Sequence, residues 1–241
     1  MNNSKKNVNT IDFNPEEMLV CYNKEFGVVE AYKSIRTNIM YSMPKTDCGK
    51  AIVLTSATAS EGKTTTVINL ALTFAQVNAK VLIIDCDLRK PKIHRYLRIE
   101  RKDGLSNVLC GFIELDNAIK VGVKENLDVL TSGEVPPNPA ELLQTDTFAS
   151  LVKELKKRYD YIFLDTPPIN IVTDSVFPIK LSEGAILLSK KDYTTYDMVE
   201  QALEKMQRAD ANVIGTILID NKENDNINYY KKSKYGYRYK E

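Results

Sequence analysis

Runs of four to seven apolar residues recur along the chain and alternate with segments in which apolar residues follow a helical spacing. The apolar runs are 51–54, 80–84, 127–130, 161–164, 185–188 and 213–219, and the helical spacing is found over 26–43 (ended by Pro44), 65–78, 105–120, 139–158 and 195–210. Because the runs are continuously apolar, both faces of each strand must be covered. The pattern predicts an α/β fold with a mostly parallel sheet covered by helices on both faces.

The two ends of the chain differ from this middle part. Residues 1–25 are rich in Asn and Lys with little periodicity, which predicts an N-terminal arm. Residues 222–241 contain almost no aliphatic side chain and cannot build a core, so we expect a flexible tail. Residues 26–221 then form one domain, in which 26–43 is a separate helix.

Composition excludes several classes of protein. The 241 residues carry 33 Lys and Arg against 32 Asp and Glu, so the net charge of +1 gives no global field for a polyanion. Four cysteines without a CxxC motif and a lone histidine, His94, do not make a disulfide framework or a histidine metal cluster. With neither a signal peptide nor 18 consecutive apolar residues, we expect a reduced, cytosolic chain.

The segment 57–65, ATASEGKTT, follows the first apolar run and ends as the phosphate-loop pattern GxxxxGK[ST] does, with Ala57 in place of the first glycine. Small residues let backbone N–H groups curl around a phosphate, and the following helix start adds a positive partial charge. Lys63 is expected to reach the β and γ phosphates, and the Thr64 hydroxyl to bind Mg²⁺. The predicted nucleotide-binding residues are Ser60, Glu61, Gly62, Lys63, Thr64 and Thr65. An ordinary strand–helix turn is the alternative.

Aspartates follow two other apolar runs. Asp85 and Asp87 come after LII, and Asp165 comes after YIFL. Ligands bind at the carboxyl ends of strands in such sheets, and a strand–Asp pattern like that of Asp165 holds Mg²⁺ in phosphate-loop enzymes. Asp85 and Asp87 face the same side of an extended chain and repel each other unless a cation or a proton transfer uses them. The alternative is an exposed loop in which Asp87 pairs with Arg89.

Tyrosines cluster at the C-terminus. Of the 13 tyrosines, five lie in the last 13 residues: Tyr229, Tyr230, Tyr235, Tyr237 and Tyr239. Five Lys and Arg residues and no acid accompany them up to Lys240. A basic tail that touches membrane or stacks on RNA is one interpretation, but no basic face elsewhere in the sequence supports it.

Together these motifs resemble the bacterial tyrosine kinases of capsular and exopolysaccharide synthesis, over roughly residues 26–241. The matching stretches are GKT, LIIDCDLRK and IFLDTPP, and the segment 133–139 with the following Glu141-Leu142-Leu143 is similar as well. Glu30, Lys33 and Arg36 resemble the family's ExxRxxR helix, through which subunits pack in a ring. The tyrosine-rich tail resembles its autophosphorylation segment.

Some residues depart from the family. Ala59-Ser60 replace a usual Pro-Gly, Lys33 replaces an arginine and loses its bidentate fork, and Ile219-Asp220-Asn221 stands where an adenine contact is expected. The core also resembles partition and division-site ATPases. Those carry a signature lysine where Thr58 stands, and they lack a tyrosine-rich tail.

The resemblance implies an ATP-dependent protein-tyrosine kinase that transfers the γ-phosphoryl group of MgATP to tyrosine hydroxyls. Lys63 would neutralise charge on the β–γ bridge, while Thr64, Asp85 and Asp165 would order the metal and its waters. Asp87 would orient the attacking phenol and accept its proton, and Arg89 would pair with the phosphate or with Asp87. The five terminal tyrosines are the expected acceptors.

The resemblance also implies partners. These are a membrane adaptor of polysaccharide chain-length control, further copies of this chain in a ring that phosphorylates in trans, and a cognate tyrosine phosphatase; no nucleic acid is expected. The protein would be cytoplasmic and recruited to the inner face of the cell membrane, with the arm 1–25 touching the adaptor. Two other functions stay open: a switch ATPase without kinase activity, and a silent regulatory subunit phosphorylated by another kinase.

Overall fold

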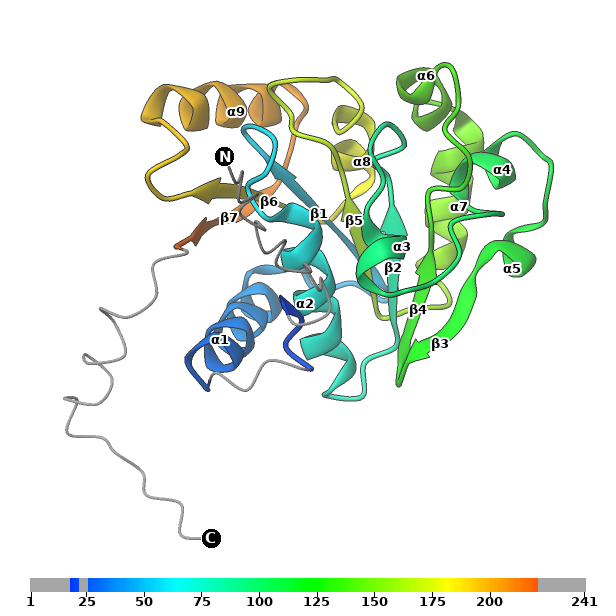
Figure 1. Ribbon diagram of the computed structural model, residues 1–241, viewed down its shortest axis with the longest axis horizontal. Helices are drawn as coiled ribbons and strands as arrows, with labels where there is room; N and C mark the ends of the chain where they lie inside the picture. Colours follow the sequence, from blue (N-terminus) through cyan, green and yellow to red (C-terminus); the bar gives the residue numbers. More distant parts are fainter. Residues whose placement is uncertain (1–17, 22–25, 221–241) are drawn as a thin grey trace, which may run out of the picture.

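The structure, a computed structural model, describes residues 18–21 and 26–220, so the tyrosine-rich tail and most of the N-terminal arm lie outside it. The described residues form a seven-stranded sheet in the order β3-β4-β2-β5-β1-β6-β7 (Figure 1). The strands are β1 Lys50–Ser56, β2 Val81–Asp85, β3 Lys120–Lys124, β4 Leu127–Leu130, β5 Tyr161–Asp165, β6 Gly184–Lys190 and β7 Val213–Ile219. All pairs are parallel except β3 with β4, which confirms the mostly parallel sheet.

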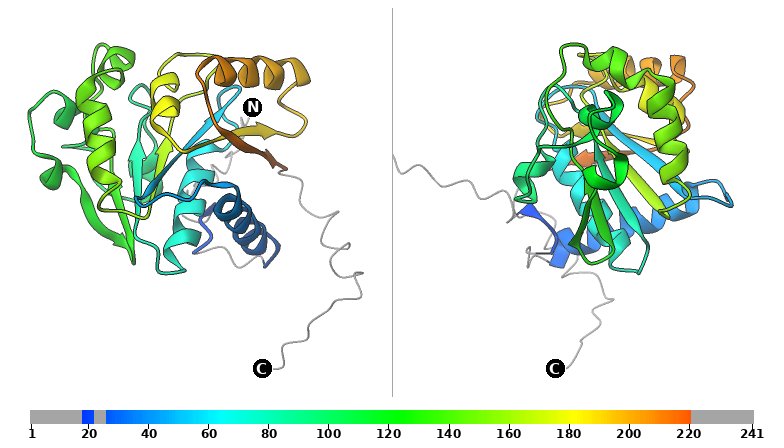
Figure 2. Two further views of the ribbon diagram at one scale, coloured as in Figure 1. Left: turned by 180° about the vertical axis from the view of Figure 1, so that it is seen from behind. Right: turned by 90° about the vertical axis from the view of Figure 1, so that its right-hand side faces the viewer.

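Helices cover both faces of the sheet (Figure 2). They are α1 Phe26–Ser42, α2 Lys63–Ala75, α3 Ile93–Tyr96, α4 Leu105–Leu109, α5 Leu115–Ala118, α6 Pro139–Leu143, α7 Asp146–Leu155, α8 Val176–Leu181 and α9 Tyr196–Arg208. Alternate residues of β1 supply the two cores: Ile52 and Leu54 pack with α1 and α2, whereas Ala51 and Val53 pack with α7, α8 and α9. The continuously apolar strands are therefore buried on both sides, as their pattern predicts.

Three local expectations were wrong or incomplete. The expected helix over 139–158 is two helices, because the Thr145 hydroxyl caps a new start by accepting a hydrogen bond from the Phe148 N–H at 3.3 Å. The helical region expected over 105–120 is two short helices, and its end already belongs to β3. β3 and α8 were not predicted; β3 turns back on β4 through Asn126, whose φ is 58°.

The described part of the N-terminal arm is attached to the domain. Leu19 and Val20 are 1% and 6% exposed, and the Asn69 side chain on α2 bonds the Val20 N–H at 2.9 Å and the Met18 carbonyl at 3.1 Å. The following helix α1 packs on α2, where Arg36 Nη1 donates to the Thr73 carbonyl at 2.6 Å. Arm and first helix thus share one support, α2.

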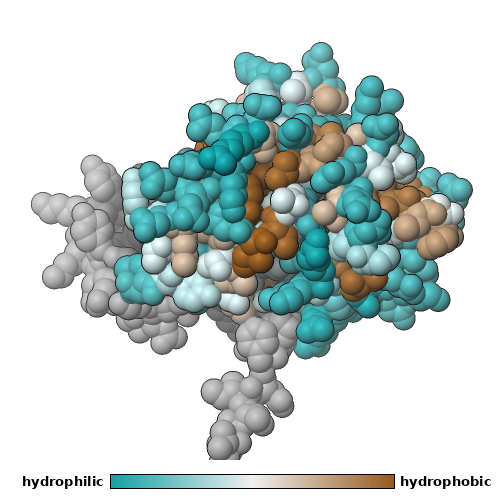
Figure 3. All heavy atoms as spheres, turned by 90° about the horizontal axis from the view of Figure 1, so that it is seen from above, coloured by the Kyte–Doolittle hydropathy of each residue, from teal (hydrophilic) through white to brown (hydrophobic). Residues whose placement is uncertain are grey.

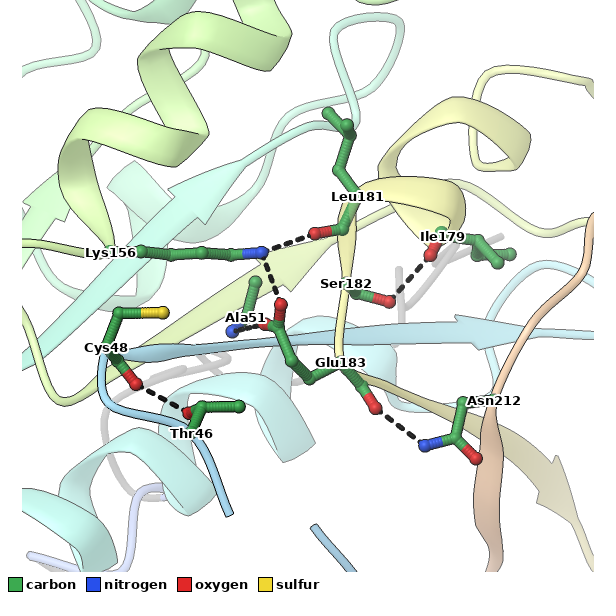
Figure 4. A network of polar contacts seen from close by, with 9 residues as sticks. All are labelled: Thr46, Cys48, Ala51, Lys156, Ile179, Leu181, Ser182, Glu183 and Asn212. Carbon is green, nitrogen blue, oxygen red and sulfur yellow. Dashed lines mark hydrogen bonds and ion pairs between the residues drawn. The ribbon is translucent and has the colours of Figure 1, made fainter. Parts of the chain in front are cut away.

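An ion pair joins three elements at the amino ends of the strands (Figure 4). Lys156, just after α7, places its Nζ 2.7 Å from Glu183 Oε1 and 2.6 Å from the Leu181 carbonyl. Glu183 Oε2 accepts the Ala51 N–H at 2.7 Å, and the Glu183 carbonyl accepts from Asn212 at 2.7 Å. This network lies at the end of the sheet opposite to Asp85 and Asp165, the last residues of β2 and β5.

Candidate active site

The phosphate loop connects β1 to α2 in the middle of the sheet. It is sharply curved, because Ser60 and Gly62 both have left-handed backbone conformations with φ of 63° and 83°. Gly62 is the N-cap of α2 and has no side chain that could occupy the first helical amides. A curved loop that leads into free helix amides is a ready-made site for an anion.

Two buried carboxylates meet beside this loop. Asp85 and Asp165 are register partners at the ends of the neighbouring parallel strands β2 and β5, and they are 0% and 2% exposed. The Thr64 hydroxyl donates to Asp165 Oδ2 at 2.7 Å. Asp85 Oδ2 and Asp165 Oδ1 are buried without a hydrogen-bond partner among the described residues. Buried carboxylate oxygens normally have a partner, so these two oxygens require a hydrogen-bond donor or a cation.

The pKa values follow from this crowding. Burial raises the pKa of Asp85 well above its usual value, and the charges of Asp165 and Asp87 raise it further. Burial raises the pKa of Asp165 to about 6, although Lys63 and the Thr64 hydrogen bond act in the opposite direction. Burial lowers the pKa of Lys63, and the nearby Asp165, Asp87 and Glu61 partly offset that. The three groups therefore lie close enough to influence one another's charge.

These residues fit a magnesium ion that is shared with a nucleotide. No group of three or more His, Cys, Asp or Glu residues in the described ranges could hold a metal alone. Mg²⁺, however, is usually bound through one or two carboxylates together with substrate phosphates and water. The two orphan aspartate oxygens and the Thr64 hydroxyl supply such a set of hard oxygen donors.

Asp87 lies just beyond β2 and is half-buried. Its N–H donates to Asp85 Oδ1 at 3.3 Å, and its own Oδ1 accepts from the Lys90 N–H at 3.0 Å. Its charge raises the pKa of both Asp85 and Asp165. Asp87 is thus held at the mouth of the same site.

Arg89 pairs with Asp174 and not with Asp87, the side-chain partner that the sequence suggested. Its Nε and Nη2 donate to the two oxygens of Asp174 at 2.7 and 3.1 Å, and the Asp174 side chain is completely buried. This bidentate pair ties the loop after β2 to the segment between β5 and α8. Asp174 was not predicted, because no motif surrounds it in the sequence and it lies 85 residues from Arg89.

The segment that carries Asp174 also brings apolar surface to this part of the molecule. It forms a groove of about 320 Å³ with α9, lined by Ile169, Ile171, Val172, Val176, Lys205 and Arg208 among others. Figure 3 shows apolar side chains in the middle of the face seen from above, between hydrophilic ones. The segment 169–176 thus contains both the buried Asp174 and apolar residues that line this groove.

The other predicted residues lie elsewhere or outside the structure. On α1, Lys33 pairs with Glu30 at 2.8 Å, and Arg36 is turned onto α2. All three have partners within the chain. The five C-terminal tyrosines and Asn221 lie outside the described residues.

The fold and the phosphate loop define a nucleotide-binding protein of the phosphate-loop ATPase class. The AAA domain family matches residues 49–218. The septum site-determining protein MinD of Pyrococcus horikoshii, complexed with Mg-ADP, has a TM-score of 0.61 and 25% identity, with 70% of each chain covered.

Several tyrosine kinases are more similar to this chain than MinD is. Tyrosine-protein kinase YwqD of Bacillus subtilis is 38% identical over 86% of this chain and 85% of its own length. Tyrosine-protein kinase CpsD of Streptococcus agalactiae is 36% identical over 83% and 85%. The crystal structure of the chimerical protein CapA2B2 has a TM-score of 0.81 at 32% identity, covering 88% of this chain and 92% of that one.

The chain therefore belongs to the AAA domain family and, within it, to the bacterial tyrosine-protein kinases. This confirms the resemblance found in the sequence, and it favours the kinase over the partition or division-site ATPase. No helix among the described residues is long and apolar enough to span a membrane.

Proposed function

We propose that this protein is a MgATP-dependent tyrosine kinase that phosphorylates tyrosines of its own C-terminal segment and regulates capsular or exopolysaccharide synthesis. The observation that carries the proposal is the meeting of Thr64, Asp85 and Asp165 beside the phosphate loop, in a chain 38% identical to a tyrosine-protein kinase.

The loop residues 60–65 bind the phosphates through backbone N–H groups, and the Lys63 ammonium neutralises charge that develops on the β–γ bridge. Thr64, Asp85 and Asp165 would hold the metal. When bound, Mg²⁺ would neutralise charge on the phosphates.

Asp87 positions the acceptor phenol at the mouth of the site. A tyrosine hydroxyl has an ordinary pKa of about 10 and an aspartate one of about 3.9, so early proton transfer is unfavourable. Asp87 therefore acts mainly by orienting the phenol and accepts its proton late, which suits a loose transition state. Half-burial and the hydrogen bond from the Lys90 N–H hold the carboxylate in place for this, and the Asp87 N–H anchors the backbone to Asp85.

The test is Lys63→Met, followed by incubation with MgATP and an anti-phosphotyrosine blot. We expect phosphotyrosine to be lost while circular dichroism shows a folded chain. The control is Lys153→Met, which should behave as wild type, because Lys153 is an exposed residue of α7 and this helix packs on the face of the sheet opposite to α2. Undiminished phosphotyrosine in purified Lys63→Met would overturn the assignment. Phosphate release without phosphotyrosine in the wild type would favour a switch ATPase, and neither product a silent subunit.

We also propose partners. A membrane adaptor recruits this chain to the inner face of the membrane through the arm 1–25, copies of the chain assemble in a ring through Glu30, Lys33 and Arg36, and a tyrosine phosphatase reverses the modification. Attachment of residues 18–21 to α2, next to α1, supports a common surface for adaptor and ring. Cell fractionation tests the first point: a chain without residues 1–17 should leave the membrane fraction, and its retention there would contradict the role of the arm.

A further inference from the structure

Glu61 is a carboxylate inside a loop that is built to bind anions. Its side chain is completely buried, although it stands two residues before Lys63. A negative charge at this position opposes the binding of phosphate unless the side chain has another task. Its contacts indicate what that task is.

Both carboxylate oxygens of Glu61 are used within the protein. Oε2 accepts the Thr58 N–H at 2.7 Å, and Oε1 accepts a hydrogen bond from the Thr194 hydroxyl. The Thr194 oxygen in turn accepts the Lys190 N–H at 2.8 Å. The side chain thus closes the curve of the phosphate loop from behind and ties it to the turn between β6 and α9.

That turn is itself fixed to the end of β7. The Lys191 N–H donates to the Ile219 carbonyl at 2.9 Å, and Lys191 Nζ lies 2.6 Å from Asp220 Oδ2. The Cγ1 of Ile219 lies 3.8 Å from the position that a Cβ on Gly62 would take. In the strand order, β6 and β7 lie on one side of β1, while β5 and β2 with their aspartates lie on the other.

We propose that Glu61 is a positioning residue that holds the phosphate loop in its binding conformation through Thr58 and Thr194 before a nucleotide arrives. Ser60, a non-glycine residue, has a left-handed conformation next to it, and such a conformation persists only where surrounding contacts determine it. Without the hydrogen bond to Thr194, the loop would become ordered only when the nucleotide binds, and the cost of this ordering would weaken nucleotide binding. The proposal rests on the proposed function.

The test compares Thr194→Val, which keeps the shape of the side chain and removes its hydroxyl, with Thr194→Ser, which restores the hydroxyl. Binding of Mg-ADP is measured by calorimetry. We expect Thr194→Val to weaken binding about tenfold, equivalent to about 1.4 kcal/mol, and Thr194→Ser to recover most of that loss. In kinase assays KM for ATP should rise while kcat at saturating ATP stays nearly constant, because the prearranged loop serves ground and transition states alike.

Thr195→Val is the matched control. Thr195 is the neighbour of Thr194, but its hydroxyl caps α9 by accepting the Met198 N–H at 3.3 Å, whereas Glu61 bonds Thr58 and Thr194. Loss of the Thr195 hydroxyl should therefore lower the melting temperature without changing ADP affinity. In a double-mutant cycle, Thr194→Val should add no further loss to Glu61→Ala. Should Glu61→Ala fail to fold, the valine and serine variants of Thr194 decide the matter alone.

Unchanged Mg-ADP affinity in Thr194→Val, or full additivity in the cycle, would overturn the inference. Because ADP has no γ-phosphoryl group, this measurement does not depend on kinase chemistry. A wild type that binds Mg-ADP but forms no phosphotyrosine would contradict the proposed function and leave the role of Glu61 standing.

Discussion

At the scale of single residues, the site is built from groups whose charges conflict in the absence of ligands. Asp85 and Asp165 are buried side by side, and each has an oxygen without a partner among the described residues. Such an arrangement costs stability and is kept where a ligand completes it. The motifs around Asp85 and Asp165 predicted both residues as part of the site. Only the register of β2 and β5 places the two carboxyl groups next to each other.

The raised pKa of Asp165 predicts that the stability of the ligand-free protein depends on pH. The folded state binds the proton with a pKa of about 6, against an ordinary 3.8. Stability is therefore lost as the pH rises through this window, and the full cost is present above it. Asp165→Asn should stabilise the ligand-free protein at about pH 7.5 by on the order of 2 kcal/mol, with little gain near pH 4.

Thermal unfolding in the presence of a chelator, at both pH values, measures this effect. The same variant should lose tyrosine phosphorylation, since it loses a proposed metal ligand. If Asp165→Asn were less stable than the wild type at about pH 7.5, burial would not be the dominant influence on this carboxyl group.

At the scale of elements, the residues of the candidate active site and a stabilising ion pair lie at opposite ends of the strands. The carboxyl ends of β1, β2 and β5 carry the phosphate loop and the aspartates, while the amino ends of β1 and β6 are joined to α7 by the Lys156–Glu183 pair (Figure 4). The apolar runs predicted most strands, because burial on both faces leaves a clear pattern. The break between α6 and α7 was missed, because a single threonine cap made it within a segment of helical periodicity.

The position of Lys156 predicts a change in stability without a change in chemistry. Lys156→Met keeps the aliphatic stem but leaves Glu183 Oε1 and the Leu181 carbonyl without this donor. We expect a loss of about 1–3 kcal/mol in the free energy of unfolding and unchanged kcat at temperatures where the chain is folded.

Urea unfolding and an autophosphorylation assay measure the two quantities. Lys157→Met is the matched control, because Lys157 is the next residue and is exposed. A loss of kcat in folded Lys156→Met would show that the two ends of the sheet are coupled.

At the scale of the whole molecule, β7 is an edge strand of the sheet, and the tyrosine-rich segment follows it in the sequence. The net charge of +1 for the whole chain conceals a segment from Tyr229 to Lys240 that carries a charge of +5. Phosphates contribute about −1.5 to −2 each, so five would bring this segment to about −2.5 to −5. Such a reversal would act against the proposed docking of this segment into an aspartate-lined site of a neighbouring copy.

We therefore expect the assembly to come apart on autophosphorylation. Sedimentation velocity before and after incubation with MgATP should show a shift to smaller species in the wild type. A variant with all five tyrosines replaced by phenylalanine keeps the charge of +5 and should stay assembled. Identical assembly states of the wild type before and after ATP would refute the switch.

The sequence by itself determined the class of fold, the phosphate loop, the aspartates and the kinase family, because each of these is written in contiguous residues with a local pattern. The tertiary structure alone decided the contacts that close the site. Thr64 meets Asp165 across 101 positions, Arg89 meets Asp174 across 85, and Thr194 meets Glu61 across 133. A hydrogen bond between side chains so far apart depends on strand order and register, which no local pattern specifies.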